Sequence, residues 1–515
     1  MKSTNEIIGQ IRQFLENWQV LTDFEDRYVY SYKKIYSREA PFLPDIVIKI
    51  DQPKNFVEFC EWAKNQNFTL LRRSETEYGV PSKNNRLTIL LDDSKKAEID
   101  LGSEKPRYLR GSLRYKMNQN VQSIYNNISL VIQLMISESN LTKCMQNDVC
   151  GGYCTITPFY KGIETWSAKG RFLLIRGLTK GDLELSQKII EIIYACSKCG
   201  NCFGECSGQI DFHKAITSIR QIIAEKQLAP EVFHTVADNI KTTGDPAATS
   251  VEKRFAWLNN TSKLKLPEKA EILYWVGCMV SYRAPQTALA FYNLLKKLKA
   301  DFKILERNEG CCGYVLFSSG LWKEAGKVAQ DVAKIIEESN IKTLITPCSG
   351  CYYTFTKLFP EIANLSLPCE ILHSSQFIEK NVNKNQFDFN PRNTNITYHD
   401  PCSLGRHSGI YNSPRNVLKL IPNLKITEMS LNKSHARCCG GGGGLWNYNH
   451  QISLDTASIR LKEDFLPLNI DILTTACPLC QMNFRITAKR HSIPVQVNDI
   501  TEIIESALIT SPEKS

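Results

Sequence analysis

The chain has 515 residues, enough for about three domains, and its hydrophobic fraction of 43% is ordinary for a soluble globular protein. No apolar run reaches the roughly 20 residues that cross a bilayer, and the polar N-terminus lacks a signal-peptide core, so we expect a cytoplasmic protein that only a partner could hold at a membrane. The net charge of +10 is spread along the chain without a recognised nucleic-acid module, which argues against nucleic acid and is compatible with an acidic partner protein.

The first part of the chain, residues 1–103, alternates helical and strand patterns. The expected elements are a helix over 7–15, a strand over 45–50, a helix over 56–64 and a strand over 68–71. These short elements predict a small α+β region at the start of the chain. Residues 104–140 are interpreted as a connector.

The middle of the chain is cysteine-bearing and helical over residues 141–225. A second linker is expected over 226–268, because Gly244, Asp245 and Pro246 form a clear break in the helical pattern. This region therefore separates the N-terminal part from whatever follows residue 268.

Two similar α/β units follow, over 269–390 and 391–510. Each begins with an apolar strand, at 272–276 and at 396–398, and each has a second strand that ends at a Cys-x-x-Cys motif, at 343–346 and at 470–473. In the first unit an apolar stripe from Ala325 to Ile336 predicts a helix between the strands. Strands that alternate with helices predict parallel sheets, whose ligands collect beyond the carboxyl ends of the strands.

The two units carry the same order of five cysteines. The first set is Cys278, Cys311, Cys312, Cys348 and Cys351, and the second is Cys402, Cys438, Cys439, Cys477 and Cys480. The copies are offset by 124 residues at the first cysteine, 127 at the adjacent pair and 129 at the last. Because Cys278, Cys348, Cys402 and Cys477 each follow a predicted strand, we expect the cysteines of each unit to meet at one sheet edge.

Clustered cysteines in a reducing compartment indicate metal ligands or catalytic groups. One zinc ion takes four ligands in a tetrahedron, so five thiols with two adjacent fit zinc poorly. A cluster of several irons offers separate metal atoms to neighbouring thiolates. Glycines flank both pairs, at Gly310 and Gly313 and over 440–444, and permit a close backbone approach with N–H donors to sulfur.

The spacings Cys-x(32)-Cys-Cys-x(35)-Cys-x-x-Cys and Cys-x(35)-Cys-Cys-x(37)-Cys-x-x-Cys resemble the cysteine-rich CCG domains in the B and D subunits of heterodisulfide reductase. The resemblance covers residues 270–485. It implies a noncubane [4Fe-4S] cluster in each repeat that reduces a disulfide, and it makes Cys311, Cys312, Cys438 and Cys439 the expected catalytic cysteines. Related iron–sulfur subunits of glycolate, D-lactate and glycerol-3-phosphate dehydrogenases share the domain but often lose some of these cysteines.

The middle region carries a bacterial-ferredoxin run of cysteines, whose fourth member usually ligates the other cluster of a pair. The run is Cys196, Cys199, Cys202 and Cys206, and its expected partner run is Cys144, Cys150 and Cys154. Pairing the runs gives one [4Fe-4S] site on Cys196, Cys199, Cys202 and Cys154. The other site, on Cys144, Cys150 and Cys206, has three thiols, so it holds a [3Fe-4S] cluster, a [4Fe-4S] cluster with a further ligand such as Asp148, or no cluster.

Three segments resemble parts of glycolate oxidase and D-lactate dehydrogenase. Residues 164–176 and 234–257 are similar to parts of the glycolate oxidase iron–sulfur subunit. Residues 20–73 are similar to the start of the flavoproteins' FAD-binding domain. Where the glycine-rich phosphate loop should follow Arg73, this chain has bulky and acidic residues over 74–78. We therefore expect a relic fold without FAD, available as a docking surface.

Together these features predict an iron–sulfur oxidoreductase subunit of heterodisulfide reductase type, working in a complex. Electrons from a redox partner protein, a flavoprotein or another subunit, would enter the ferredoxin-type clusters and pass to the repeated clusters, where a disulfide or other sulfur substrate reacts. The alternative is the electron-transfer subunit of a flavin-dependent D-lactate, glycolate or glycerol-3-phosphate dehydrogenase.

A few further residues lie outside the cysteine motifs or beside Cys402. Cys60 and Cys369 lie outside the motifs and are expected to be small buried side chains. His399 and Asp400, with Arg406 and His407, surround Cys402 in the sequence. They either line a substrate site or cap a helix and satisfy a loop.

Overall fold

The computed structural model describes residues 4–16, 19–31, 46–49, 59, 62–63, 69–72, 88–92, 152–204, 206, 210–258, 269–382 and 387–509. The expected connector 104–140, the acidic segment 74–78, Asp148 and the cysteines Cys60, Cys144 and Cys150 lie outside these residues. The chain divides into two compact units. One comprises Met1–Ile193 with Cys202–Ala215, and the other Tyr194–Asn201 with Ile216–Ser515.

The first unit begins with a four-stranded sheet in the order β1-β2-β4-β3. Its strands are β1 (Val20–Leu21), β2 (Ile46–Lys49), β3 (Thr69–Arg72) and β4 (Thr88–Asp92). β1 is antiparallel to β2, whereas β2 and β3 both run parallel to β4. Ile46 and Ile48 are fully buried with Ile11 and Phe59 in one apolar cluster, so helix α1 (Thr4–Ile11) packs on the sheet. The expected strands at 45–50 and 68–71 correspond to β2 and β3.

Helix α2 (Phe24–Ser31) ties this sheet region to the helical segment that follows it in the same unit. The Thr165 hydroxyl donates to the Asp26 carboxylate at 2.6 Å, and the Tyr28 hydroxyl donates to Asp182 at 3.0 Å. Three further helices are α7 (Ala168–Lys180), α8 (Gln187–Tyr194) and α9 (Asn201–Gly204). α7 begins at a capping Ser167, whose side chain accepts from Gly170 N, and ends at Gly181 with a φ of 74°.

The second unit contains the two repeats, each built on a four-stranded parallel sheet. The first repeat has the order β6-β5-β7-β8 and the second has the equivalent order β11-β10-β12-β13. Their strands are β5 (Ile272–Tyr274), β6 (Phe302–Lys303), β7 (Thr343–Thr346), β8 (Glu370–His373), β10 (Thr394–His399), β11 (Leu424–Ile426), β12 (Ile472–Thr475) and β13 (Gln496–Asp499). All neighbouring strands are parallel. This confirms the mixed α/β class with short parallel sheets in two cysteine-rich repeats.

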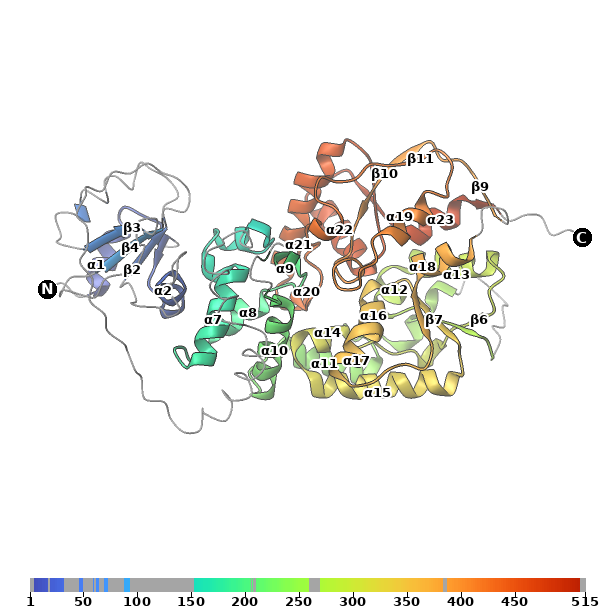
Figure 1. The fold of residues 1–515 in the computed structure, drawn as a ribbon, viewed down its shortest axis with the longest axis horizontal. Coiled ribbons are helices and arrows are strands. Elements are labelled where there is room, and N and C mark those ends of the chain that lie inside the picture. Colours follow the sequence, from blue (N-terminus) through green and yellow to red (C-terminus); the bar gives the residue numbers. More distant parts are fainter. Residues whose placement is uncertain are drawn as a thin grey trace, which may run out of the picture. The chain divides into compact units, whose positions relative to one another are not determined.

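The helices of each repeat lie between and beside its strands (Figure 1). The first repeat has α12 (Cys278–Arg283), α13 (Pro285–Lys297), α14 (Tyr314–Ser319), α15 (Trp322–Ser339), α16 (Ser349–Tyr353), α17 (Phe359–Ile362) and α18 (Ser374–Asn381). The second has α19 (Asn412–Leu418), α20 (Leu445–Tyr448), α21 (His450–Ile459), α22 (Pro478–Arg490) and α23 (Ile500–Ala507). The predicted apolar stripe lies on α15, where Ala325, Ala329 and Ile336 are buried.

The two repeats pack directly on each other through α13 against α23, α12 against α22, and α18 against α19. At the centre of this interface the buried Thr287 hydroxyl contacts the Glu502 carboxylate at 2.7 Å and the Gln481 side-chain oxygen at 3.2 Å. A short antiparallel pair, β9 (Asp388–Phe389) with β14 (Leu508–Ile509), adds to the contact. These contacts hold the two cysteine-bearing edges together within one compact unit.

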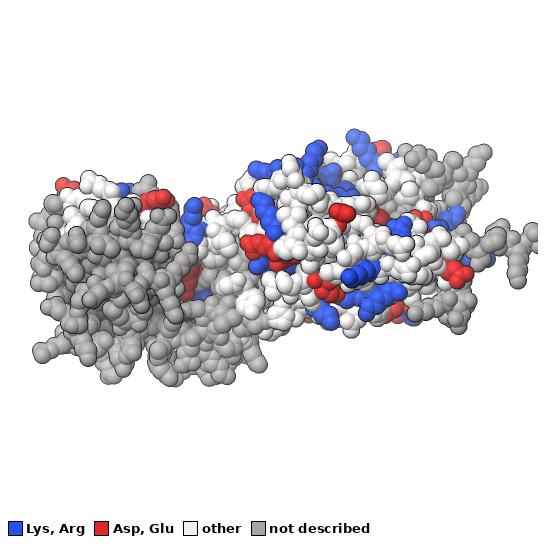
Figure 2. All heavy atoms as spheres, turned by 90° about the horizontal axis from the view of Figure 1, so that it is seen from above, with Lys and Arg blue, Asp and Glu red and all other residues white. Residues whose placement is uncertain are grey.

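Helices α10 (Phe212–Glu225) and α11 (Glu231–Thr243) precede the repeats, and α11 packs on α14 and α20. The segment expected as a second linker thus contains a helix, which ends at Gly244 with a φ of 67°. Lysine and arginine side chains are interspersed with acidic ones over the face in Figure 2. None of the helices among the described residues is long and apolar enough to cross a membrane.

Candidate functional site

The five cysteines of the first repeat converge at the carboxyl edge of its sheet. Cys278 begins α12 four residues after Tyr274, the last residue of β5, and Cys348 lies two residues after Thr346, the last residue of β7. The sulfur atoms of Cys278 and Cys311 are 3.9 Å apart, and the Cys312 thiol interacts with those of Cys311 and Cys351. The side chains of all five are buried. Residues far apart in sequence therefore form one compact group of sulfurs, as the position after the strands predicted.

The second repeat gathers its five cysteines in the same way. The sulfurs of Cys439 and Cys480 are 3.1 Å apart, and Cys480 also interacts with Cys477. Cys438 interacts with Cys402, the only member of this set that is partly exposed. This second group is a structural copy of the first.

Within each adjacent pair the pKa of the first thiol is raised and the pKa of the second is lowered. Hydrogen bonds from Cys311 and Cys351 lower the pKa of Cys312 to about 6, and hydrogen bonds from Cys438 and Cys480 lower the pKa of Cys439 well below its usual range. For Cys311 the Cys278 thiol lowers the pKa, but the hydrogen bond with Cys312 and burial outweigh it, so the pKa is raised. Each group thus favours a thiolate, the form that binds metal.

Backbone N–H groups supplied by glycine point at the sulfurs. Gly313 N donates to Cys311 at 3.4 Å, and Gly440 N donates to Cys438 at 3.2 Å, two residues after the sulfur in each case. Gly313 and Gly440 have φ values of 80° and 81°, a left-handed conformation that glycine adopts without strain. Gly441 N also lies 3.5 Å from the Cys439 sulfur. Such donors stabilise negative charge on sulfur and tune the potential of a cluster.

Buried ion pairs support both cysteine groups. In the first repeat, Glu309 accepts hydrogen bonds from Val276 N at 2.9 Å and Gly277 N at 2.7 Å, and pairs with Arg254 at 3.3 Å. In the second, Asp400 pairs with Arg415 at 2.7 Å. Asp400 is therefore a structural partner of Arg415, which matches the interpretation that it satisfies a loop. Glu309 was not singled out from the sequence, where only its position two residues before the cysteine pair could have marked it.

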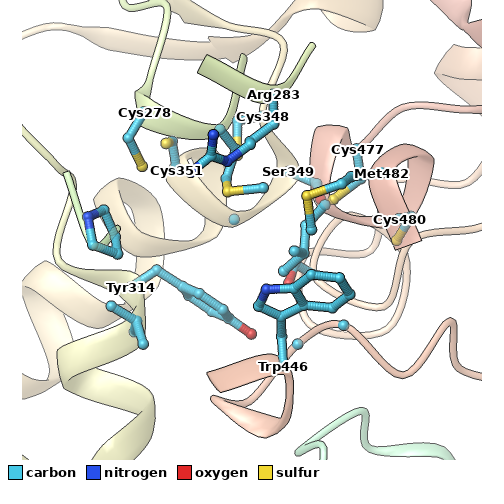
Figure 3. Close-up of a pocket in the computed structure, with 18 of the residues that line it drawn as sticks. Cys278, Arg283, Tyr314, Cys348, Ser349, Cys351, Trp446, Cys477, Cys480 and Met482 are labelled. Carbon is cyan, nitrogen blue, oxygen red and sulfur yellow. The ribbon is translucent and has the colours of Figure 1, made fainter. Parts of the chain in front are cut away.

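One cavity of about 340 Å³ reaches both cysteine groups. It is lined by Cys278, Cys311, Cys312, Cys348 and Cys351 from the first repeat and by Cys402, Cys439, Cys477 and Cys480 from the second. Figure 3 shows the labelled cysteines of the two repeats on different sides of this space, with Tyr314 and Trp446 between them at one end. Ser349 of the first repeat and Cys477 of the second both line this cavity. The two groups therefore line one shared cavity.

The rest of the cavity wall is mainly apolar. Its hydrophobic side chains include Met279, Val315, Trp446, Leu479, Met482 and Ile486. Arg283 and Asp245 are the charged residues among those that line it. Neither Tyr314 nor Trp446 was predicted from the sequence, because each comes from a helix that brings it to the cavity only after the repeats pack together.

His399 lies inside the second cysteine group. Its ring nitrogen and the sulfurs of Cys439 and Cys480 all lie within 4.8 Å of one another, and the ring packs edge-on against Phe484. Burial lowers the pKa of His399, so the neutral imidazole is favoured. At the equivalent position before Cys278 the first repeat has Trp275. The second group therefore has one donor atom more than the first.

The described cysteines of the ferredoxin-like runs fall in both units. In the first unit, Arg171 Nη1 lies 3.7 Å from the Cys154 sulfur, and Ile210 N donates to Cys206 at 3.4 Å. Cys202 lies on α9 of the same unit. Cys196 and Cys199 belong to the second unit, where Lys198 N donates to Cys196 at 3.4 Å. The assignment of these thiols to two clusters stays a prediction.

The Cys196–Cys199 segment is fastened to the repeats within the second unit. Arg220 is fully buried and donates to the carbonyl oxygens of Cys196 at 2.6 Å, Ser318 at 2.9 Å and Gly443 at 2.6 Å. His407 Nε2 lies 3.0 Å from Lys198 O, and burial lowers the pKa of His407 to about 3, so the ring is neutral. The segment is thus attached to both repeats at once.

The fit to iron–sulfur clusters follows from this chemistry. Each repeat offers five converging thiols, an acidified member of an adjacent pair and backbone donors to sulfur. Two of these thiols are adjacent in sequence, an arrangement that suits a cluster with several metal atoms better than one tetrahedral ion. The residues present therefore fit a cluster in each repeat.

Comparison with known proteins agrees with this chemistry. The family model of the cysteine-rich CCG domain matches residues 272–356 and 396–485. The chain is 31% identical to the D subunit of dihydromethanophenazine:CoB–CoM heterodisulfide reductase from Methanosarcina barkeri, over 61% of this chain and 78% of the relative, and 31% identical to its counterpart from Methanosarcina acetivorans, over 65% and 83%. It is 25% identical to a probable iron–sulfur-binding oxidoreductase of Bacillus subtilis, over 62% and 47%. The chain belongs to the family of heterodisulfide reductase D subunits and is an iron–sulfur oxidoreductase with two cysteine-rich CCG domains.

Proposed function

We propose that this protein reduces a disulfide, or another sulfur substrate, in the cavity between its two repeated cysteine groups. The observation that carries the proposal is the single cavity of about 340 Å³ lined by sulfurs from both repeats. A volume of this size is at the lower end of small-molecule sites. The completeness of both five-cysteine sets supports chemistry at these groups over simple conduction of electrons.

The cofactors proposed are a noncubane [4Fe-4S] cluster in each repeat, held by Cys278, Cys311, Cys312, Cys348 and Cys351 and by Cys402, Cys438, Cys439, Cys477 and Cys480. Bound there, the clusters supply one-electron chemistry at two points of the cavity wall. In the ferredoxin-like runs we propose one [4Fe-4S] site on Cys154, Cys196, Cys199 and Cys202. The type of any second cluster, on Cys144, Cys150 and Cys206, stays open.

The reaction needs two electrons and two protons for each disulfide. The S–S bond breaks, each sulfur gains one electron and one proton, and two thiols leave. Because cysteine sulfurs of both repeats line the cavity, each sulfur atom of the disulfide can lie beside one of the two cysteine groups. The protons come from solvent at the open side of the cavity.

The other cavity residues bind and orient the substrate. The apolar side chains, among them Met279, Trp446 and Met482, favour a substrate with an apolar arm and exclude water from it. Arg283 offers a positive charge for an anionic group on the same substrate. Burial raises the pKa of Tyr314, so its hydroxyl stays protonated and able to donate a hydrogen bond.

The electrons come from a redox partner protein through the ferredoxin-type cysteines. Support for a partner comes from the names of relatives, which are the D subunit of a heterodisulfide reductase and the B subunit of a fumarate reductase (CoM/CoB). We propose the N-terminal region as a docking surface that no longer binds FAD. Its hydrogen bonds to residues 165 and 182 connect it to the ferredoxin-like segment.

The test replaces Cys311 and Cys312 with serine in the purified complex and measures reduction of a disulfide together with iron content. We expect disulfide reduction to be lost, with part of the iron. The matched control is Cys369→Ser, because Cys369 is a half-buried cysteine outside both sets, and its activity should stay native. Unchanged disulfide reduction in the double variant would overturn the proposal. Co-purification with a D-lactate or glycolate dehydrogenase would then favour the electron-transfer alternative.

A further inference from the structure

We propose that electrons from the ferredoxin-like cysteines enter the repeated centres at the second repeat, and that the positive charge of Arg406 favours this step. In this role Arg406 is a positioning residue. It holds the Cys199 segment beside Cys438 and favours the reduced state of the second-repeat centre. The inference deepens the proposed function and rests on it in one respect, namely that Cys199 and Cys438 are ligands of redox centres.

Arg406 holds the two cysteine segments together through its hydrogen bonds. Its Nε donates to the carbonyl oxygen of Cys199 at 2.8 Å. On the other side, Nη1 donates to the carbonyl oxygens of Ala436 at 2.6 Å and Ser434 at 3.1 Å. Ala436 is two residues before Cys438, so one guanidinium fixes the ferredoxin-like run against the stretch of chain that enters the second cysteine pair.

The sulfurs at this junction are close to one another. The Cys438 thiol lies near enough to Cys199 to raise its pKa, with burial adding to the effect, and Cys402 and Cys439 in turn lie near enough to Cys438 to raise its pKa. Within the second unit, this is the place where a ferredoxin-like cysteine meets a cysteine of a repeat. Because electron transfer slows steeply with distance, the contact favours entry at the second repeat.

Arg406 places a positive charge among these sulfurs. Burial lowers the pKa of Arg406, but the neighbouring sulfurs of Cys199, Cys402 and Cys438 outweigh it and raise the pKa, so the guanidinium keeps its charge. Its Nη2 is buried and has no hydrogen-bond partner among the described residues. A buried N–H that is left unpaired is costly, and a sulfur acceptor of a bound cluster would satisfy it.

The first repeat lacks this arrangement at the equivalent position. Four residues after its leading cysteine it has Tyr282, where the second repeat has Arg406. Near Cys278 the buried guanidinium of Arg254 is neutralised by the buried carboxylate of Glu309, and Arg283 lies in the cavity wall. No carboxylate within the described ranges pairs with Arg406, which hydrogen-bonds to carbonyl oxygens instead. A guanidinium that joins a ferredoxin-like cysteine segment to the second cysteine pair by hydrogen bonds therefore distinguishes the second repeat.

A fixed positive charge lowers the free energy of the more negative state of a nearby group. The reduced state on the Cys438 side carries one more electron than the oxidised state, so Arg406 favours its formation. In the step proposed, one electron leaves the ferredoxin-type side, which is oxidised, and arrives at the second repeat, which is reduced. The redox partner restores the electron that was lost.

The experiment is a redox titration of the full, anaerobically purified protein followed by electron paramagnetic resonance. The signal that disappears in Cys438→Ser/Cys439→Ser identifies the second repeat, and the signal of the first repeat serves as an internal reference. For Arg406→Gln we expect the second-repeat potential to become more negative, with about a tenfold lower reduced-to-oxidised ratio at fixed ambient potential, or about 59 mV for one electron. Arg406→Lys keeps the charge and should stay near the native potential.

The matched control is Arg485→Gln. Arg485 also donates from Nε to a carbonyl oxygen, that of Val497 at 2.9 Å, but its guanidinium pairs with Glu502. We expect native potentials for this variant. The proposal is overturned if Arg406→Gln keeps the native second-repeat potential, or if Arg406→Lys shifts it as far as Arg406→Gln does.

Loss of the signal is also informative. If Arg406→Gln loses the second-repeat signal while Arg406→Lys keeps it at native potential, the need for the charge is supported. If both variants lose it, Arg406 only holds the fold and the proposal fails. Disulfide reduction is not measured here, so this result and the test of the proposed function can fail separately.

Discussion

Arg254 and Glu309 form an ion pair at 3.3 Å in which both side chains are fully buried. The pair joins three segments around the first cysteine group. Glu309 accepts from Val276 N and Gly277 N, just before Cys278, while Arg254 donates to the carbonyl oxygen of Gly244 at 2.7 Å. A residue of the segment before the repeats thus fixes the loop that begins the first cysteine group.

Arg254→Met should destabilise the protein strongly, because it leaves the Glu309 carboxylate buried without its partner. Removing one member of a buried ion pair typically costs about 3–5 kcal/mol. We expect a lower denaturant midpoint of unfolding and loss of iron from the first repeat. The control is Lys253→Met, which changes an exposed neighbour and should stay within about 0.5 kcal/mol of native. Equal midpoints for the two variants would contradict the structural role given to the pair.

Gly443→Ala should detach the Cys196–Cys199 segment from the second repeat. Gly443 has a φ of 63°, and a Cβ there would lie 2.2 Å from the carbonyl oxygen of Ser197. A left-handed conformation costs a non-glycine residue about 1–2 kcal/mol, and the backbone clash adds to it. We expect loss of the ferredoxin-type signal in electron paramagnetic resonance with the first-repeat signal retained.

The matched control for that variant is Gly326→Ala, in the second turn of α15. A Cβ at Gly326 meets nothing within 4 Å. Alanine is favoured over glycine inside a helix by up to about 1 kcal/mol, so this variant should be as stable as the native protein or slightly more stable. A native ferredoxin-type signal in Gly443→Ala would show that the close approach to Ser197 is dispensable.

The contribution of Asp499 to the free energy of unfolding should fall as the pH rises from about 4 to about 8. Burial raises the pKa of Asp499 from its usual value of 3.8 to about 8, although hydrogen bonds from Thr501 oppose the shift. In this window the folded state holds the proton and the unfolded state does not, so the free energy of unfolding declines by about 1.4 kcal/mol per pH unit. Asn at this position still caps α23 but does not ionise, so Asp499→Asn should remove this slope.

The measurement is denaturant unfolding followed by circular dichroism at several pH values between about 4 and about 8.5, which span the window of this titration. Asp331→Asn is the control, because Asp331 is exposed on α15 and its replacement should leave the native pH dependence intact. At the alkaline end of the range Asp499→Asn should be more stable than the native protein. A slope unchanged by Asp499→Asn would contradict the assignment of the buried proton to this residue.

Metal analysis tests the cluster content directly. About 15 iron atoms per chain would fit four clusters of which one has three irons. Removal of iron with a chelator should lower the unfolding midpoint, because the thiols of both cysteine groups then lose the atoms that hold them together. A content of roughly two zinc ions per chain, without iron, would contradict the iron–sulfur assignment.

The strands and the repeat were predictable because they depend on local patterns. β7 was predicted at 343–346, its observed position, since an apolar run there is bounded by a lysine and by the Pro-Cys that ends it. β12 was expected at 470–473 and lies at Ile472–Thr475, two residues later. The apolar pattern identifies a strand but not its ends, which the pairing with β10 and β13 decides.

The sequence by itself determined the two sets of five cysteines, their α/β setting and the chemistry that thiols in this pattern allow, because order and spacing are properties of the chain. Only the tertiary structure decided that both sets face one cavity, that Arg220 connects Cys196 with the distant Gly443, and that Cys199 meets Cys438 beside Arg406. These relationships arise when helices of the two repeats bury their apolar faces against each other. Because these contacts join residues that are far apart in the chain, no spacing in the sequence predicts them.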